Sequence, residues 1–418
     1  MSMKMLQTDA AVIGGGAAGL LAAATLAESG VKTLLIEPNK QLGRKLRITG
    51  KGRCNVTNAC DVKTFLDNVP RNGKFLYSAV NRFTPAETMA FFERLGVPLK
   101  VERGSRVFPV SDSAHDIANA LESACRRSGV QKLRGSVRKI ETENGALARV
   151  LTDETEIACR AAILCTGGKS YPGTGSTGDG YGLAEALGHS IVEPKPSLVP
   201  LVSPDSFCAE MQGFAPRNVT LRVFERERLL YEELGEMLFT HFGVSGPLVL
   251  SASAHMRDFD KKAYRLSIDL KPGLNEKQLD ERILRDFHKY QNRDFANALA
   301  DLEGRAMIPV LVRLSGIPAE EKVNSITKEQ RKGLLSLFKN FPVAISGPRP
   351  IAEAIVTSGG VNVREIDPKT MGSKLVPGLY FAGELIDVDA YTGGFNLQIA
   401  WSTARAAAWA AAARIQGS

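Results

Sequence analysis

Short apolar runs and amphipathic segments alternate along the first 190 residues. Ala10 to Ile13 is a four-residue apolar run, Leu20 to Ser29 is rich in alanine and leucine, and Val31 to Ile36 is a second apolar run. Farther along, Ser113 to Ser128 has helical periodicity, and Ala161 to Cys165 has the pattern of a buried strand. Strands and helices in this order predict an α/β fold with a parallel sheet, because a helix must carry the chain back between parallel strands.

The pattern changes near Glu193, where prolines follow at 194, 196 and 200. This change predicts a domain boundary. Residues 194–273 carry alternating apolar positions typical of strands, and residues 274–340 switch to charged helical periodicity. Strand patterns return at Phe341 to Ala344 and Ala352 to Thr357, and a long Ala-rich helix is expected from Asn396 to Ile415. We therefore expect residues 1–193 and 357–418 to form one domain, interrupted by a β-rich insert (194–273 and 341–356) and a helical subdomain (274–340).

A glycine-rich turn joins the first apolar run to the helix that follows. Gly14, Gly16 and Gly19 match the pattern G-x-G-x-x-G, with a strand directly before it and a helix directly after it. In this motif the first glycine permits a tight turn, the second lets the backbone approach a pyrophosphate, and the third lets the helix pack closely. The free N–H groups and positive dipole end of the helix face the phosphates. The predicted cradle consists of Gly14, Gly15, Gly16, Ala17, Ala18 and Gly19.

Glu37 ends the second apolar run, at the position where a dinucleotide fold binds a ribose diol. Its carboxylate can accept hydrogen bonds from two ribose hydroxyls, whereas it repels a 2′-phosphate. NADP is therefore disfavoured at this site, and FAD and NAD remain.

Composition excludes several other classes of protein. The chain has 418 residues, 44% hydrophobic and 23% charged, which is ordinary for a soluble globular protein of two or three domains. Residues 10–27 lack charge, but three consecutive glycines argue against a membrane span. Six scattered cysteines form no C-x-x-C pair, so we expect reduced thiols, a cytoplasmic protein and no structural metal site.

The formal net charge of +8 is concentrated in one segment. Between Pro38 and Cys60 the chain carries no acid and six cations: Lys40, Arg44, Lys45, Arg47, Lys51 and Arg53. Three interpretations are open: a solvated surface loop, a nucleic-acid contact, or a set of donors for the diphosphate of the cofactor. We favour the third, because the segment follows Glu37 directly and its glycines let the backbone approach a ligand.

Two later segments decide between FAD and NAD. Ile163 to Gly168 reads Ile-Leu-Cys-Thr-Gly-Gly, and Leu379 to Glu384 reads Leu-Tyr-Phe-Ala-Gly-Glu, followed by a glycine pair and Phe395-Asn-Leu-Gln398. Flavoproteins with two dinucleotide-binding domains are similar, with a Thr-Gly turn after a late strand and a C-terminal acid near the ribityl chain. A plain NAD dehydrogenase has no use for the last segment, so we expect FAD.

Five further motifs strengthen this resemblance. They are Gly50-Lys-Gly-Arg-Cys-Asn-Val-Thr-Asn58, Arg106-Val-Phe-Pro-Val-Ser-Asp112, Ser170-Tyr-Pro-Gly-Thr-Gly-Ser-Thr-Gly-Asp179, His241-Phe-Gly-Val-Ser-Gly-Pro247 and Gly393-Gly-Phe-Asn-Leu-Gln398. Together they resemble the bacterial BaiN/YhiN-type flavoproteins, also labelled the aminoacetone oxidase family, over nearly the whole chain. One departure is Phe395, where tyrosine is expected.

The resemblance implies an α/β fold: a Rossmann-like FAD/NAD(P)-binding domain with a β-barrel-like insert and a small helical subdomain. It implies an FAD-dependent oxidoreductase with a small-molecule substrate and NAD(P)H as electron donor. Labels in the family range from amine oxidase to steroid ene reductase. We therefore expect reduction of an activated C=C bond, with amine oxidation and an RNA-binding flavoprotein as alternatives. We expect no membrane contact and no nucleic acid, and the oligomeric state is not indicated.

The residues assigned to FAD come from all these segments. Beyond the cradle, they are Glu37, Pro38, Lys45, Gly52, Arg53, Asn55, Val137, Thr166, Gly167, Gly168, Gly383, Glu384, Gly394, Asn396, Leu397 and Gln398. Candidate catalytic residues are Tyr171 and Tyr391, which adjoin glycine-rich loops expected to face the flavin, and His241 in a loop of the insert. Each could move a proton, and each could equally be a packing residue.

Two further features allow a second interpretation. Gly173 to Gly178 also matches G-x-G-x-x-G and could bind a second nucleotide, but the preceding strand ends well before it and Pro172 adjoins the first glycine. A glycine-rich loop over the flavin is the preferred interpretation. Cys54, beside Arg53 and Lys51, could be a redox-active thiol, although a packed thiol is the commoner case.

Overall fold

The computed structural model describes residues 3–417 and divides them into two compact units. The first unit comprises residues 1–197 and 351–418, and the second comprises residues 198–350. Each unit has its own hydrophobic core, and each is described separately below.

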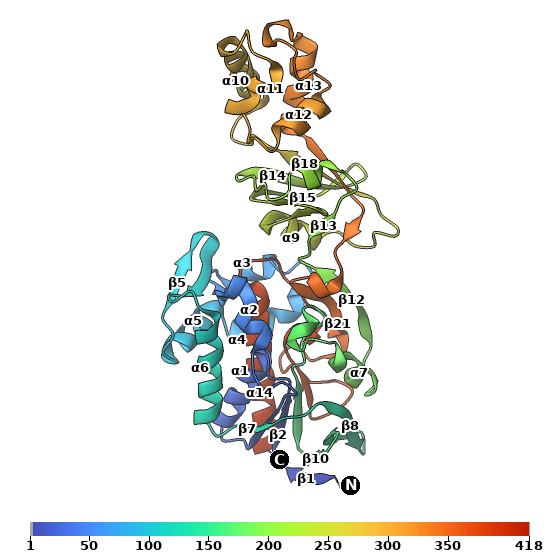
Figure 1. The fold of residues 1–418 in the computed structure, drawn as a ribbon. Helices are drawn as coiled ribbons and strands as arrows, with labels where there is room; N and C mark the ends of the chain where they lie inside the picture. Colours follow the sequence, from blue (N-terminus) through green and yellow to red (C-terminus); the bar gives the residue numbers. More distant parts are fainter. Residues whose placement is uncertain (1–2, 418) are drawn as a thin grey trace. The chain divides into compact units, whose positions relative to one another are not determined.

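A five-stranded parallel sheet forms the centre of the first unit (Figure 1). Every pair of neighbours in it is parallel. In spatial order its strands are β22 (Leu379–Phe381), β11 (Ala161–Leu164), β2 (Ala10–Ile13), β3 (Thr33–Ile36) and β7 (Gln131–Leu133). The strands β2, β3, β11 and β22 are buried along their whole length, which explains their uninterrupted apolar sequences.

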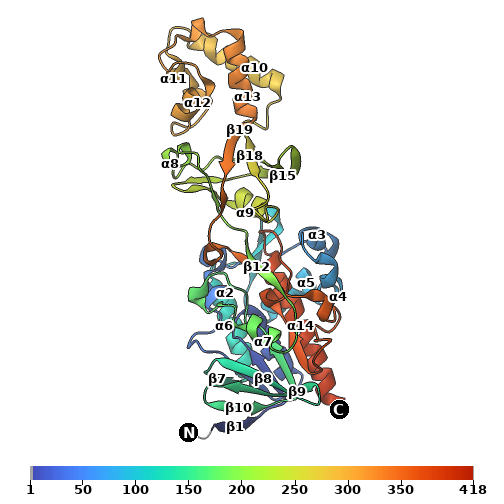
Figure 2. The same cartoon turned by 90° about the vertical axis from the view of Figure 1, so that its right-hand side faces the viewer.

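Helices cover this sheet and carry the chain between its strands (Figures 1 and 2). The Ala-rich helices α1 (Ala17–Glu28) and α14 (Phe395–Gln416) pack against each other, and small alanines permit this close contact. The remaining helices of the unit are α2 (Arg44–Ile48), α3 (Val62–Asp67), α4 (Tyr77–Arg82), α5 (Pro85–Arg94), α6 (Ala114–Arg127) and α7 (Asp179–Glu185). Thr84 caps α5 in a capping box with Glu87.

Three smaller sheets complete the first unit. The four-stranded sheet consists of β1 (Lys4–Gln7), β10 (Thr155–Ala158), β9 (Ala146–Thr152) and β8 (Val137–Glu143). The three-stranded sheet consists of β4 (Thr57–Asn58), β6 (Arg106–Pro109) and β5 (Leu99–Glu102). The pair β12 (Ile191–Ser197) and β21 (Val356–Val361) is antiparallel and contains a register shift between Val192 and Lys195. Pro194 lies within this shift, and Pro196 lies opposite Thr357 in a two-stranded sheet, where a residue without an N–H donor is tolerated.

The sequence pattern misplaced some strand boundaries. Val130 to Ile140, which read as strand, holds two strands in different sheets, because the chain turns at Gly135, whose N–H donates to the Glu37 carbonyl at 3.3 Å. The strand expected at Ala352 to Thr357 lies at Val356–Val361, after a 3-10 turn over Ile351–Glu353. Both errors arise because a short periodic segment does not specify where a strand begins or ends.

Two four-stranded antiparallel sheets and a group of helices form the second unit (Figure 2). One sheet orders β16 (Leu238–Thr240), β17 (Gly243–Ser245), β13 (Leu201–Val202) and β20 (Gly347–Pro348); the other orders β15 (Arg228–Gly235), β14 (Val219–Glu225), β18 (Tyr264–Asp269) and β19 (Phe341–Ile345). The helices are α8 (Phe207–Glu210), α9 (Pro247–Ser253), α10 (Glu276–Lys289), α11 (Phe295–Ala298), α12 (Ile308–Ser315) and α13 (Lys328–Lys339). Within residues 274–340, where helices are expected, the segment from Arg293 to Leu302 forms only one turn of α-helix followed by a 3-10 turn.

Candidate cofactor site and active site

The glycine-rich turn has the geometry that a dinucleotide cradle requires. Gly14 has φ +104°, and a side chain there would meet the Cys165 carbonyl oxygen at 2.5 Å. A Cβ atom on Gly19 would lie 1.8 Å from the Gly14 carbonyl oxygen. Both positions therefore exclude any side chain because of the protein's own backbone, and they bring α1 close to β2 and β11.

Gly16 differs from the other two glycines. It precedes α1 with φ −79° and ψ −165°, which any residue can adopt, and a Cβ atom there would meet nothing within 4 Å. The protein itself therefore does not require glycine at this position. Open space beside the N-terminus of α1 fits a diphosphate approaching the backbone.

The Glu37 carboxylate lies beside this turn. Its Oε2 accepts from the Gly15 N–H at 2.7 Å, and its Oε1 accepts from the Asn39 N–H at 2.9 Å. Oε1 also accepts from Asn39 Nδ2 at 2.6 Å. These bonds hold the carboxylate in place, and Oε2 retains a lone-pair site for a ribose hydroxyl.

Segments from three parts of the chain meet at the carboxyl ends of the parallel strands. The Gly43 N–H donates to the Gly15 carbonyl at 2.8 Å, so the start of the basic segment joins the turn. Gly383 lies against α1, because a Cβ atom there would be 3.0 Å from Ala18 Cβ. Thr166 follows β11 at the same edge of the sheet. In open α/β sheets this edge is where ligands bind.

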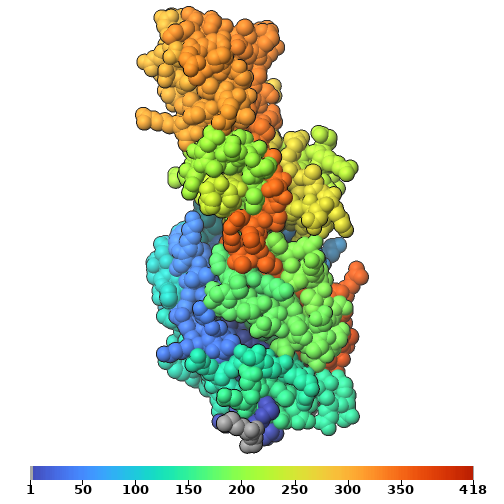
Figure 3. Space-filling view, turned by 45° about the vertical axis from the view of Figure 1, so that its right-hand side comes forward, coloured from blue at the N-terminus to red at the C-terminus, as the bar shows by residue number. Residues whose placement is uncertain are grey.

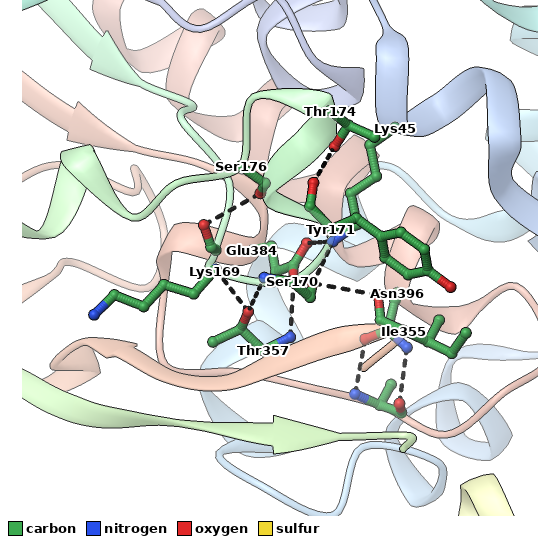
Figure 4. A network of polar contacts seen from close by, with 12 residues as sticks. Lys45, Lys169, Ser170, Tyr171, Thr174, Ser176, Ile355, Thr357, Glu384 and Asn396 are labelled. Atoms are coloured by element: carbon green, nitrogen blue, oxygen red, sulfur yellow. Dashed lines mark hydrogen bonds and ion pairs between the residues drawn. The ribbon is translucent and has the colours of Figure 1, made fainter. Parts of the chain in front are cut away.

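A polar network links the basic segment to the C-terminal acid (Figure 4). Lys45 Nζ donates to Glu384 Oε2 at 2.7 Å and to Ser170 Oγ at 2.6 Å. Ser170 Oγ donates to Glu384 Oε1 at 2.9 Å, and the Thr357 N–H donates to the same oxygen at 2.8 Å. The segment around residue 40 and the loop after β11 adjoin on the surface of the first unit, in blue and green (Figure 3). Sequence reasoning missed Ser170 and Thr357 as members of the site, although Ser170 begins one of the quoted motifs.

The N-terminus of α14 lies against the segment that contains Asn55. A Cβ atom on Gly394, at φ +98°, would be 2.3 Å from the Thr57 carbonyl oxygen and 2.9 Å from Asn55 Oδ1. The Asn396 side chain bonds both the N–H and the carbonyl of Ala390, at 2.9 and 2.8 Å. Gln398 is fully buried and bonds Thr57, Phe83 and Ser402. Gln398 therefore anchors α14. Leu397 lies between Asn396 and Gln398 in the first turn of this helix.

Two buried polar atoms at this site have no protein partner among residues 3–417: Thr166 Oγ1 and Asn55 Oδ1. Buried polar atoms are normally hydrogen-bonded, so a group from outside the chain fits both. Together with the open space at Gly16, they show that the residues present fit an FAD molecule.

Other residues assigned to the cofactor lie around these segments. The Pro38 carbonyl accepts from Arg134 Nε at 3.2 Å, and Val137 begins β8. Gly167 and Gly168 continue the turn after β11, and Gly52 has φ +84° with open space beside it. Arg53 pairs with Glu102 and Asp112 and stacks over Phe108, with 4.2 Å from its Cζ to the ring centroid.

The three candidate catalytic residues have different surroundings. Tyr171 adjoins the polar network and has φ +52°, and its ring points away from the network (Figure 4). Tyr391 lies in the loop before α14, where its N–H donates to the Asn68 carbonyl at 3.1 Å. His241 is exposed and belongs to the second unit, at the turn between β16 and β17.

Two alternative sites receive no support from the geometry. A 3-10 turn, Pro172–Thr174, begins eight residues after β11 ends and overlaps Gly173 to Gly178, which precedes the seven-residue helix α7. The segment therefore lacks the direct strand-to-helix turn of a nucleotide fingerprint. Cys54 is fully buried, and burial raises the pKa of its thiol to about 12. It is therefore a protonated, packed thiol at neutral pH. Within residues 3–417 no three His, Cys, Asp or Glu side chains are grouped to hold a metal ion.

The parallel sheet, the glycine cradle and the C-terminal acid define a flavoprotein of the Rossmann class, an FAD-dependent oxidoreductase. The chain belongs to the HI0933-like protein family, whose Rossmann-domain profile matches residues 8–410. The resemblance drawn from the motifs is thereby confirmed.

Relatives and solved structures agree with this assignment. The chain is 31% identical to a ribosomal RNA dihydrouridine synthase of Escherichia coli (strain K12), over 97% of this chain and 98% of the relative. It is 32% identical to a 3-dehydro-bile acid delta(4,6)-reductase of Clostridium scindens, over 96% of this chain and 98% of the relative. The 3-ketosteroid-Δ4-(5α)-dehydrogenase of Rhodococcus jostii RHA1 has the same fold, with a TM-score of 0.55 at 15% identity, covering 97% of both chains. Among the helices of residues 3–417, none combines the length and hydrophobicity that crossing a bilayer requires.

Replacing Lys45 with alanine is expected to weaken FAD binding by about 10- to 150-fold, the equivalent of one charge-assisted hydrogen bond of about 1.5–3 kcal/mol. Arg53→Ala, at another residue assigned to FAD, is the comparison variant: it removes the same charge from the same segment, but its guanidinium binds two carboxylates, whereas Lys45 binds one. Titration of each apoprotein with FAD, followed by flavin fluorescence, measures both affinities. Equal weakening by the two variants would show that the segment acts only through its overall positive potential.

Proposed function

We propose that this protein reduces a C=C bond conjugated to a carbonyl group, with NAD(P)H as the electron donor. The proposal rests on two relatives, each about one-third identical to this chain, whose names describe the same change of a bond. A delta(4,6)-reductase saturates C=C bonds of an unsaturated ketone. Dihydrouridine is uridine whose C5=C6 bond, next to a carbonyl, has been saturated. One reaction type accounts for both names.

Bound FAD supplies hydride transfer, and the protein must supply a proton and exclude water. Reduction of a conjugated C=C bond places the hydride on one carbon and a proton on the other. Tyr171 is the first candidate for the proton donor. The preceding residue, Ser170, binds Glu384, and the phenol of Tyr171 makes no hydrogen bond among the described residues. Tyr391, in the loop before α14, is the second candidate for this role.

RNA is the second candidate substrate. The two names point to different substrate classes at nearly equal identity, and the chain has a formal net charge of +8. Uracil in RNA and an unsaturated steroid ketone present the same conjugated group to a flavin. A nucleic-acid substrate would in addition require phosphate contacts, and binding would weaken steeply as salt rises.

The test follows the flavin absorbance of the purified protein in two anaerobic half-reactions. NADH, NADPH and small primary amines are first offered separately to the oxidised protein. The reduced protein is then mixed with a 3-oxo-4-ene steroid, with a uridine-containing RNA, or with oxygen.

Bleaching by NADH or NADPH and recovery with the steroid or the RNA support the proposal, and the product shows which substrate is used. A matching RNA in which every uridine is replaced by dihydrouridine controls for binding without reduction. Bleaching by an amine and recovery only with oxygen would instead identify an amine oxidase.

A further inference from the structure

The backbone of Tyr171 adopts a left-handed conformation that a tyrosine rarely occupies. Its φ is +52° and its ψ is +57°. Bulky residues avoid this region unless the surrounding structure determines it, and such positions concentrate at functional sites. The carbonyl of Tyr171 accepts from the Thr174 N–H at 2.8 Å and from Thr174 Oγ1 at 2.7 Å. Its N–H donates to the Ala352 carbonyl at 3.2 Å. Both sides of the residue are therefore tied to the fold.

Ser170, the preceding residue, is the most constrained residue of this loop. It is fully buried, and its hydroxyl bridges the Lys45 ammonium and the Glu384 carboxylate. Its N–H donates to Thr357 Oγ1 at 3.1 Å, and the Lys169 N–H donates to the same oxygen at 2.8 Å. One hydroxyl of β21 thus receives two consecutive backbone N–H groups of the loop.

These contacts join parts of the fold that the cofactor also needs. Glu384 follows β22, Lys45 lies in α2, and Thr357 lies in β21. Ser170 is the point at which all three meet (Figure 4). The direction in which residue 171 leaves the network is therefore set by Ser170 rather than by contacts of the phenol itself.

We infer that Ser170 is a positioning residue, which holds Tyr171 in its left-handed conformation and so aims the phenol at the reacting carbon. The inference rests on the proposed function, in which Tyr171 donates the proton. Thr357 acts with Ser170 by fixing the backbone of the loop, while Lys45 and Glu384 fix the hydroxyl of Ser170.

The test compares Ser170→Ala and Thr357→Val with a control, Thr177→Val. Thr177 lies in the same loop, but its side chain is exposed and forms no hydrogen bond among the described residues. Hydrogen–deuterium exchange of the peptide covering residues 168–178 is measured with and without FAD. The anaerobic recovery of the reduced flavin is measured with the substrate that the wild-type protein uses.

Ser170→Ala and Thr357→Val are each expected to speed exchange in this peptide, even without FAD, and to slow flavin recovery at saturating substrate by about 10- to 100-fold, the usual effect of a misplaced catalytic group. The control should change neither quantity. Unchanged exchange and recovery in Ser170→Ala would overturn the inference, as would faster exchange with normal recovery. Failure of the wild-type protein to reduce any C=C substrate would instead refute the proposed function, whatever the exchange of the loop.

Discussion

Gly16→Val is expected to give a folded protein that does not retain FAD. The structure leaves open space beside Gly16, so valine meets no protein atom within 4 Å at its Cβ, and the backbone conformation suits it. The same side chain would occupy the space that a diphosphate needs next to the N-terminus of α1. Losing two or more charge-assisted hydrogen bonds of about 1.5–3 kcal/mol each weakens binding by at least about 100-fold.

Two further glycine variants make this result specific. Gly19→Val should fail to fold, because its Cβ would lie 1.8 Å from the Gly14 carbonyl oxygen. Gly273→Val, in a loop of the second unit with open space beside it, should keep both the fold and FAD. Circular dichroism reports folding, and the flavin released on heating reports retention. A yellow Gly16→Val protein with normal FAD content would show that the diphosphate lies elsewhere.

Tyr171→Phe is expected to slow flavin recovery by the unsaturated substrate about 100- to 10,000-fold, the usual contribution of a general acid. The variant keeps the ring and loses only the hydroxyl, which forms no hydrogen bond among residues 3–417. FAD content and reduction of the flavin by dithionite should therefore remain normal. Stopped-flow absorbance of the anaerobic half-reactions separates these steps.

Tyr391→Phe is the matched variant for this experiment, because it removes the same hydroxyl from the other candidate. A large loss in Tyr391→Phe and none in Tyr171→Phe would assign the proton to Tyr391 and would contradict the role inferred for Ser170. Full activity in both variants would exclude Tyr171 and Tyr391 as the proton donor.

The cofactor and the fold of the domain that binds it could be predicted from local sequence. The turn from Gly14 to Gly19 is specific because backbone sterics and packing act over a few consecutive residues. The place of Glu37 beside this turn could be predicted for the same reason, since it follows a strand of predictable length. Helical segments were also predictable: α10 and α13, which have a cap and an amphipathic face, lie within residues 274–340, where helices are expected.

Pairings across long sequence separations could not be predicted in this way. Ser170 and Glu384 are 214 residues apart, and Lys45 and Glu384 are 339 residues apart. The spacing of charged residues alone does not distinguish Lys45 from Arg53, because both lie in one basic segment. Tertiary structure separates them, with Lys45 directed to Glu384 and Arg53 held by Glu102 and Asp112.

The sequence by itself determined the class of cofactor, the family and the α/β architecture of this protein, because the glycine turn, the acid after the second strand and the strand–helix periodicity are local properties. Only the tertiary structure decided which side chains surround Tyr171, the candidate proton donor. Ser170 and Thr357 are ordinary polar residues, and they acquire a role only because the packing of β21 and β22 brings Thr357 and Glu384 to one buried hydroxyl.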